Sequence, residues 1–339
     1  MSAIEFWTVV IAGAIGLSAP IIVAGVGEIV FERAGGFNVG IEGMMLLGAA
    51  TGVVGARVGG VWVGLLFALL AGVVAGGVLG FAHAIVRADI VVVGVAVGTI
   101  TTGLSVFIYQ WLSPAGAVNR TVPTQPVLTL PLLEHLPLVG RGLAHAGLFF
   151  YASLVLVVVV GWFLRNTRAG LRLTAVGAAP EVARDRGISP SATLCTAAVF
   201  AGGCAGLGGA VVSLGSIGTF SPGMTGGVGF IALAVVIVAR GRPGGLVIGA
   251  LGFAFFNSLA LLAQTRDLGL PVELYQGLPY AVALAVLCVA ASGRGVGGRL
   301  RRRPPPAATR PSGNTGDTKP PVTGNDKHSH PDQPQEALS

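Results

Sequence analysis

Charged side chains are scarce in this chain. Only 10% of its 339 residues are Asp, Glu, Lys or Arg, whereas 53% are hydrophobic, and the segment 187–239 contains no charged residue. A water-soluble globule needs more polar surface than this composition offers, whereas a helix that crosses a bilayer needs about 20 predominantly apolar residues. Residues 1–293 are therefore predicted to form an all-α, polytopic bundle of membrane-spanning helices.

Lysine is almost absent, and so are the common catalytic motifs. The only lysines are Lys319 and Lys327, so the phosphate-binding loop G-x-x-x-x-G-K-[ST] cannot form. His83, His135 and His145 lie in different segments, without a Ser-His-Asp or His-Glu-x-x-His arrangement. We therefore expect the chain not to be an enzyme, to have no ATPase site of its own and to bind no cofactor.

Cysteine is rare, whereas glycine is abundant. Cys195, Cys204 and Cys288 have neither paired spacing nor a nearby histidine, so no disulfide framework and no metal site are predicted. The 54 glycines lie mostly inside apolar runs, where small residues let membrane helices approach closely. The row Gly72, Gly76 and Gly80 is accordingly predicted to be a helix-packing face rather than a ligand site.

Apolar runs between the charged residues predict eight to ten membrane spans. They lie near 6–27, 44–58, 60–86, 90–112, 147–165, 191–213, 227–239, 243–265 and 275–292. The run 44–58 is short for a crossing, and the preceding segment 28–43 contains Glu28, Glu32, Arg33 and Glu42. This region is therefore predicted to be a broken or re-entrant helix.

Arginines collect in three regions, which predicts the orientation of the chain. These regions are the 166–190 loop, the Arg240–Arg242 turn and the segment that begins at Arg294. Because positive charge accumulates on the cytoplasmic side, all three are predicted to be cytoplasmic, and the 113–146 connection external. Nine spans would place the N-terminus outside, but one miscounted helix near residue 43 would reverse that assignment.

The composition changes after the last predicted span. Residues 294–339 are rich in Pro, Gly, Ser and Thr, and they begin with a basic cluster that includes Arg301, Arg302 and Arg303. Such a composition predicts a disordered, basic, Pro-rich cytoplasmic tail. The basic start is interpreted as an anchor at the anionic inner leaflet rather than as a nucleic-acid site.

Two breaks at membrane depth resemble each other. The first runs from Gly35 to Met44 and the second from Ser221 to Gly227, and each leads into a short apolar run, an arginine turn and a long glycine-rich helix. Their arginines are assigned to opposite faces, which is the pattern of an inverted repeat. Polar breaks inside a membrane tend to line a pathway. The candidate translocation residues are Asn38, Glu42, Ser221, Pro222, Gly223 and Thr225.

A structural role is favoured for Glu42, because a buried carboxylate usually needs a local partner. The alternative is that Asn38 and Glu42 hydrogen-bond a polar solute.

A short charged helix is predicted in the loop between the fifth and sixth spans. Pro180 suits the first helical position, Glu181 complements the N-terminus, and Gly187 suits a left-handed C-terminal cap. The helix is either an ordinary connector or a coupling element that fits a cytoplasmic motor subunit. The candidate coupling residues are Pro180, Glu181, Arg184, Asp185, Arg186 and Gly187.

Several segments in the same order resemble permease subunits of ABC importers. The main one is the motif Glu32-Arg33-x-Gly35-x-x-Asn38-Val39-Gly40-Ile41-Glu42-Gly43-Met44, and others include Ala88-Asp89-Ile90-Val91, Phe220-Ser221-Pro222-Gly223-Met224-Thr225 and Gly229-Phe230-Ile231-Ala232. They are similar to the nucleoside, or basic-membrane-lipoprotein-linked, type, which is related to ribose and branched-chain amino acid permeases. The resemblance covers about 20–290 and assigns a structural role to Glu32, Arg33, Gly35, Gly40, Gly43 and Asp89.

This chain departs from the family pattern at three positions. Ala179 replaces the usual Asn before Pro180, which removes a helix cap. Val228 replaces a usual Arg, and Gly98 replaces a usual Asn that could have met the substrate.

The resemblance implies a multi-pass plasma-membrane subunit that translocates a small polar solute, with a nucleoside favoured. It implies three protein partners: an ABC ATP-binding subunit that carries ATP and Mg²⁺, a second related permease and an extracellular substrate-binding lipoprotein. No nucleic-acid partner is expected. Sugar or amino-acid ABC permeases remain alternatives, as does an ATP-independent secondary transporter.

Overall fold

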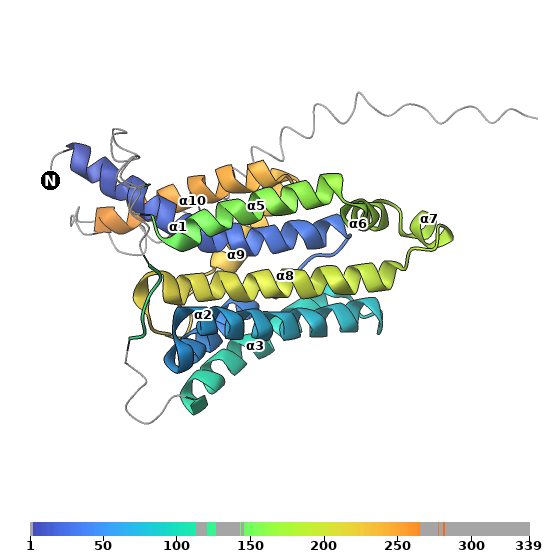
Figure 1. Cartoon of the computed structure of the whole chain (residues 1–339), viewed down its shortest axis with the longest axis horizontal. Helices are drawn as coiled ribbons and strands as arrows, with labels where there is room; N and C mark the ends of the chain where they lie inside the picture. Colours follow the sequence, from blue (N-terminus) through green and yellow to red (C-terminus); the bar gives the residue numbers. More distant parts are fainter. Residues whose placement is uncertain are drawn as a thin grey trace, which may run out of the picture. The chain divides into compact units, whose positions relative to one another are not determined.

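A computed structural model describes residues 3–112, 121–126, 143, 146–264, 277 and 281 of the chain. The described residues fold into a helical bundle without β-strands, whose long helices run in similar directions (Figure 1). The helices are α1 (Ala3–Arg33), α2 (Ile41–Ala84), α3 (Ile90–Leu112), α5 (Leu148–Asn166), α6 (Arg168–Ala178), α7 (Pro180–Asp185), α8 (Pro190–Val212), the π-helical turn η2 (Ser213–Ile217), α9 (Val228–Ala239) and α10 (Pro243–Gln264).

Six of these helices are long and apolar enough to cross a membrane, which confirms a polytopic bundle. Helix α2 is bent back on itself, because Gly59 and Gly60 leave the helical conformation and Gly60 has a φ of 78°. The two arms run side by side: a Cβ atom on Gly55 would lie 2.9 Å from the Cβ atom of Phe67. Counting both arms and the short α9, the described residues contain eight apolar helical segments.

The first predicted break is narrower than the sequence suggested. Helix α1 continues through Glu28 and Glu32 to Arg33, and the chain leaves the helical conformation only between 34 and 40. The prediction that span 6–27 ends before Glu28 was therefore wrong. The charged residues stay in the helix because Glu28 accepts a hydrogen bond from the Asn38 backbone (3.0 Å) and Arg33 donates one to the Gly241 carbonyl (3.2 Å).

The predicted bounds of the spans from α3 to α10 agree with the observed helices to within about two residues. The predicted span 275–292, most of the 113–146 connection and the 294–339 tail lie outside the described residues.

Glycines bring α2 and α8 into close contact, as the glycine row predicted. A Cβ atom on Gly72 would overlap the Gly202 carbonyl oxygen, and one on Gly76 would overlap that of Ala198. The two backbones thus touch without intervening side chains, which is how small residues stabilise helix pairs in lipid.

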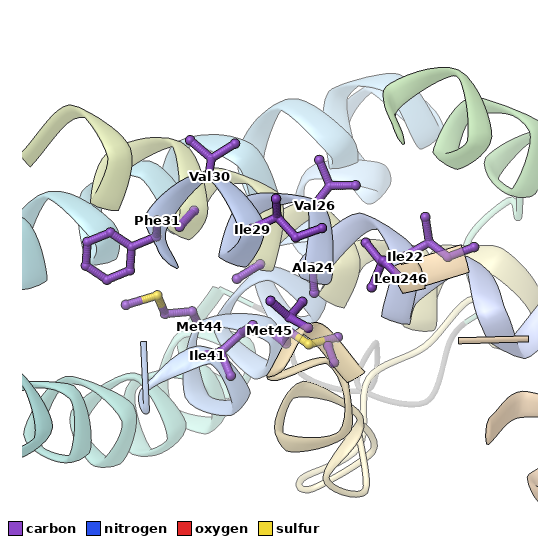
Figure 2. Close-up of a cluster of buried hydrophobic side chains, with 14 of the residues drawn as sticks. Ile22, Ala24, Val26, Ile29, Val30, Phe31, Ile41, Met44, Met45 and Leu246 are labelled. Carbon is purple, nitrogen blue, oxygen red and sulfur yellow. The ribbon is translucent and has the colours of Figure 1, made fainter. Parts of the chain in front are cut away.

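Large apolar side chains fill the bundle where α1, α2 and α10 meet. Figure 2 shows Phe31 of α1 near Met44 of α2, and Leu246 of α10 beside Ile22. A second buried cluster lies toward the other end of the bundle and includes Ile15, Tyr109 and Phe149.

The two short helices that follow the breaks lead to opposite ends of the bundle. The first arm of α2 ends near Arg57, whose guanidinium donates to the Tyr109 hydroxyl (2.9 Å). Helix α9 ends at Arg240, and the adjacent Gly241 contacts Arg33 at the end of α1. Two half-helices that start together and diverge are the arrangement expected for the two breaks of an inverted repeat.

Candidate functional site

Glu42 joins the two breaks. It lies in the first turn of α2, and its carboxylate accepts hydrogen bonds from the Thr225 hydroxyl (2.5 Å), the Gly227 N–H (2.9 Å) and the Gly229 N–H (2.7 Å). The last two are among the N–H groups at the start of α9 that have no partner within their own helix. A carboxylate at a helix N-terminus is also favoured by the helix dipole. Glu42 therefore caps α9 from α2 and holds both half-helices at one point.

Gly229 allows this contact. A Cβ atom at position 229 would lie 2.8 Å from the Cα and 2.8 Å from the Oε2 atom of Glu42, closer than real side-chain contacts permit. Only glycine lets the backbone of α9 come this near to α2.

Asn38 lies inside the protein and not on an open surface. It is fully buried, its backbone N–H donates to Glu28 Oε1 (3.0 Å), and its side-chain amide donates to the Met44 sulfur (3.4 Å). These contacts hold the first break against α1 and α2.

The candidate translocation residues of the second break differ in their exposure. Ser221, Pro222 and Gly223 are exposed, whereas Thr225 is buried against Glu42. Of the six candidate translocation residues, the structure thus brings Glu42 and Thr225 into direct contact.

The motif residues around the first break are packing and anchoring groups. Gly40 and Gly43 face α3. A Cβ atom on Gly40 would lie 2.5 Å from the Gly94 carbonyl oxygen, and one on Gly43 would overlap the Gly98 carbonyl oxygen. Asp89 caps α3 by accepting from the N–H groups of Val91 (2.9 Å) and Val92 (3.1 Å). Gly98 stands where the family pattern has Asn. A Cβ atom at this position would lie 3.0 Å from Gly40 Cα, so glycine here allows α3 to lie close to the first break.

Glu32 and Arg33 meet the turn between α9 and α10. The Arg33 guanidinium donates to the Gly241 carbonyl (3.2 Å), and the Glu32 carboxylate lies beside the same glycine. Arg240 and Gly241 both have positive φ (55° and 61°), so this turn is sharp.

The predicted charged helix between the fifth and sixth spans is confirmed as α7. Pro180 occupies its first turn, and it ends in a Schellman motif in which Gly187 has a φ of 78° and the Ile188 N–H donates to the Ala183 carbonyl (3.0 Å). Ala179 provides no side-chain cap. Glu181 and Arg184 form an exposed ion pair (3.2 Å), and Asp185 and Arg186 are also exposed.

Helix α6 connects this charged segment to the first break. A Cβ atom on Gly177 would overlap the Arg33 carbonyl oxygen and lie 2.9 Å from the Gly35 nitrogen. The backbone of α6 therefore rests directly on the chain where α1 ends. A displacement of α6 and α7 would push on the segment that leads to Glu42.

A cavity of about 710 Å³ extends to the same junction. It lies among α1, α5, α8, α9, α10 and the 121–126 segment, and Thr225 is part of its wall. Its other polar side chains are Gln125, Asn257, Ser258 and Gln264, and none of its described lining residues is charged.

Gln125 holds together three segments of the cavity wall through hydrogen bonds. Its side chain donates to the Gly215 carbonyl (2.9 Å) and accepts from the Phe149 N–H (2.8 Å), while its backbone N–H donates to the Leu214 carbonyl (2.9 Å). Both flanking elements, α5 and η2, are thereby joined to the 121–126 segment.

Sequence reasoning did not single out Gln125, Asn257 or Gln264, and it took Glu28 as a sign of a break rather than as the partner of Asn38. The isolated amides in α10 carry a weak signal, because a polar side chain within an apolar span tends to face a cavity or pathway. No sequence signal points to Gln125, since its partners are backbone groups distant in the sequence.

Comparisons with known proteins agree with the motif resemblance. Residues 10–287 match the family described as branched-chain amino acid transport system / permease component. A "Putative glucose ABC transporter permease protein" of Haloferax volcanii is 35% identical over 74% of this chain and 76% of its own length. A nucleoside ABC transporter permease of Lactococcus lactis is 29% identical over 85% and 94%, and a guanosine ABC transporter permease of Bacillus subtilis is 27% identical over 79% and 86%. No solved structure matches the chain.

Proposed function

The chain belongs to the family of permease components of the branched-chain amino acid transport system type, and from this membership we propose that it is the translocating subunit of an ATP-driven importer for nucleosides. Relatives named as nucleoside or guanosine ABC transporter permeases support this choice of solute. Glucose is the second candidate, because relatives of Haloferax volcanii bear that name.

The contact between Glu42 and α9 carries the proposal. Two half-helices whose N-termini meet inside a membrane bundle are the arrangement by which transporters build a central pathway. Because α2 and α9 lead from Glu42 to opposite ends, a movement at either end reaches the same junction. Alternating access then corresponds to a shift between two arrangements of these half-helices.

The partners follow from the division of labour in such an importer. An ABC ATP-binding subunit carries ATP and Mg²⁺ and binds the cytoplasmic 166–190 loop, with Pro180–Gly187 as the coupling element. A second, related permease completes the pathway. An extracellular lipoprotein delivers the solute to the side of the 113–146 connection.

The contact between Gly177 and the Arg33–Gly35 backbone supplies the mechanical route. When the ATPase subunits close, they move α7 and α6, and α6 displaces the first break. Glu42 passes this displacement to α9 through its three hydrogen bonds.

Reconstitution of the complete transporter tests the proposal. The chain, its ATPase, the second permease and the lipoprotein are placed in liposomes, and uptake of radiolabelled guanosine, adenosine, glucose and leucine is measured with and without ATP. We expect concentrative, ATP-dependent uptake of the nucleosides. Uptake of glucose or leucine in preference to nucleosides contradicts the assignment of solute, and uptake without ATP contradicts the importer mechanism.

A further inference from the structure

The cavity of about 710 Å³ that ends at Thr225 has the size of a small-molecule site. It is lined by the middle of α1, from Gly13 to Ile21, and by the C-terminal part of α10, from Asn257 to Gln264. It therefore lies on the opposite side of the Glu42 junction from α7 and the Arg33–Gly241 contact. A solute arriving from the end away from α7 would stop at this junction.

Two amide side chains in this cavity lack partners within the described part of the chain. Asn257 and Gln264 are half-buried, line the cavity and form no side-chain hydrogen bond with a described residue. They are seven positions apart, so they lie on the same face of α10 about 10 Å apart along its axis. Polar groups at membrane depth are costly unless they face a cavity, water or a solute.

Thr225 adds a third polar group at the inner limit of the cavity. Its hydroxyl hydrogen is used in the bond to Glu42, so its oxygen remains available as an acceptor. Glu42 itself is occupied by three donors and is not among the residues that line the cavity.

The described lining residues favour an uncharged solute. A solute with a net or zwitterionic charge would need a buried counter-charge, and the described lining offers none. The Phe149 and Phe150 side chains line the same cavity and provide flat apolar surface. Side-chain amides present a donor and an acceptor together, which matches the edge of a nucleobase.

We propose that this cavity is a nucleoside-binding site in which Asn257 and Gln264 hydrogen-bond the solute and Thr225 forms its inner limit. This proposal rests on the proposed function as a nucleoside importer. It adds where the solute binds and that the solute is uncharged. Gln125 is a wall residue, because both ends of its amide already bind backbone groups.

The test uses the complete transporter in liposomes with lipoprotein saturated with radiolabelled guanosine. Asn257→Ala and Gln264→Ala each remove one hydrogen-bonding group, and we expect the maximal uptake rate to fall about three- to ten-fold. The apparent affinity for the loaded lipoprotein should stay unchanged, since neither residue is needed for docking. Gln110→Ala, an exposed amide on α3, is the matched control and should transport at the wild-type rate.

A second measurement separates solute binding from a purely structural role. Asn257→Cys should react with a water-soluble thiol reagent faster than the native cysteines do, and guanosine should slow the reaction. Wild-type protein gives the background of the three native cysteines, of which Cys204 is buried and Cys195 half-buried. This labelling needs only an inserted protein, so it decides the question even if a variant fails to assemble.

The outcomes distinguish the two proposals. If the wild-type complex shows no ATP-dependent nucleoside uptake, the proposed function is wrong. If it imports guanosine and both alanine variants do so equally fast, or if guanosine leaves the labelling of Asn257→Cys unchanged, only the assignment of the cavity is overturned.

Discussion

Glu42 and Gly229 form the closest contact between the two breaks, and each needs the other. The carboxylate supplies acceptors for the start of α9, and the missing side chain at position 229 makes room for it. Hydrogen bonds to charged groups contribute roughly 1.5–3 kcal/mol each, and a buried donor left without a partner costs a similar amount. A single methyl group at position 229 is therefore expected to disturb the whole junction.

We predict that Gly229→Ala lowers both the thermal stability of the purified protein and its transport rate in the complete importer. Gly103→Ala on α3 is the control, because a Cβ atom there meets nothing within 4 Å. That control should be neutral or more stable by roughly 0.5–1 kcal/mol, as expected for glycine to alanine in a helix. Melting curves in detergent measure both effects, and equal melting temperatures for the two variants would contradict the role of the contact.

At the level of elements, α6 and α7 stand out because they are charged and exposed in an otherwise apolar protein. The ion pair between Glu181 and Arg184 is exposed and contributes little to stability. We therefore expect the role of α6 and α7 to depend on their shape. Thr167 caps the start of α6, and the turn at Gly187 ends α7. Its contact with the end of α1 joins this segment to the membrane bundle, as the proposed coupling role requires.

Replacing 181–186 with a Gly-Ser segment of equal length should abolish transport and uncouple ATP hydrolysis from it. Membrane insertion should be preserved, because no residue of α7 belongs to the apolar spans. Uptake and ATPase rates in liposomes, with the amount of inserted protein as the control, measure this. Undiminished uptake would show that the segment is an ordinary connector.

At the level of the whole molecule, the chain is a conduit whose movement depends on other subunits. The first arm of α2 and α9 diverge from Glu42, while α6, the end of α1 and the α9–α10 turn gather at one end of the bundle. In the proposed importer, energy supplied by the ATPase at that end reaches the centre through these contacts.

The chain alone in liposomes is therefore expected to accumulate no nucleoside against a gradient, with or without ATP or an ion gradient. Adding the ATPase, the second permease and the lipoprotein should restore concentrative uptake measured with radiolabelled guanosine. Uphill transport by the chain alone would instead identify a secondary transporter.

Much of this arrangement could be predicted from the sequence because membrane helices leave strong local signals. Long apolar runs, the Pro180 and Gly187 boundaries of α7 and the glycine row on α2 each depend on residues close together in the chain. The position where α1 ends was misjudged, because Glu28 and Glu32 look like the end of a span when their partners are unknown. The Asn38 N–H that binds Glu28 returns to α1 only after the chain has turned at Gly35.

Composition and contiguous motifs were enough to identify the class of protein, the family and the membrane spans that the structure describes. The cap that Glu42 provides for α9, the contact of Gly177 with the end of α1 and the cavity shared by Asn257, Gln264 and Thr225 became visible only in the folded chain. Hydrogen bonds and close backbone contacts act over a few ångströms in space, whatever the distance along the chain. Glu42 and Gly229 are separated by 187 positions in the chain, and no local pattern records that they touch.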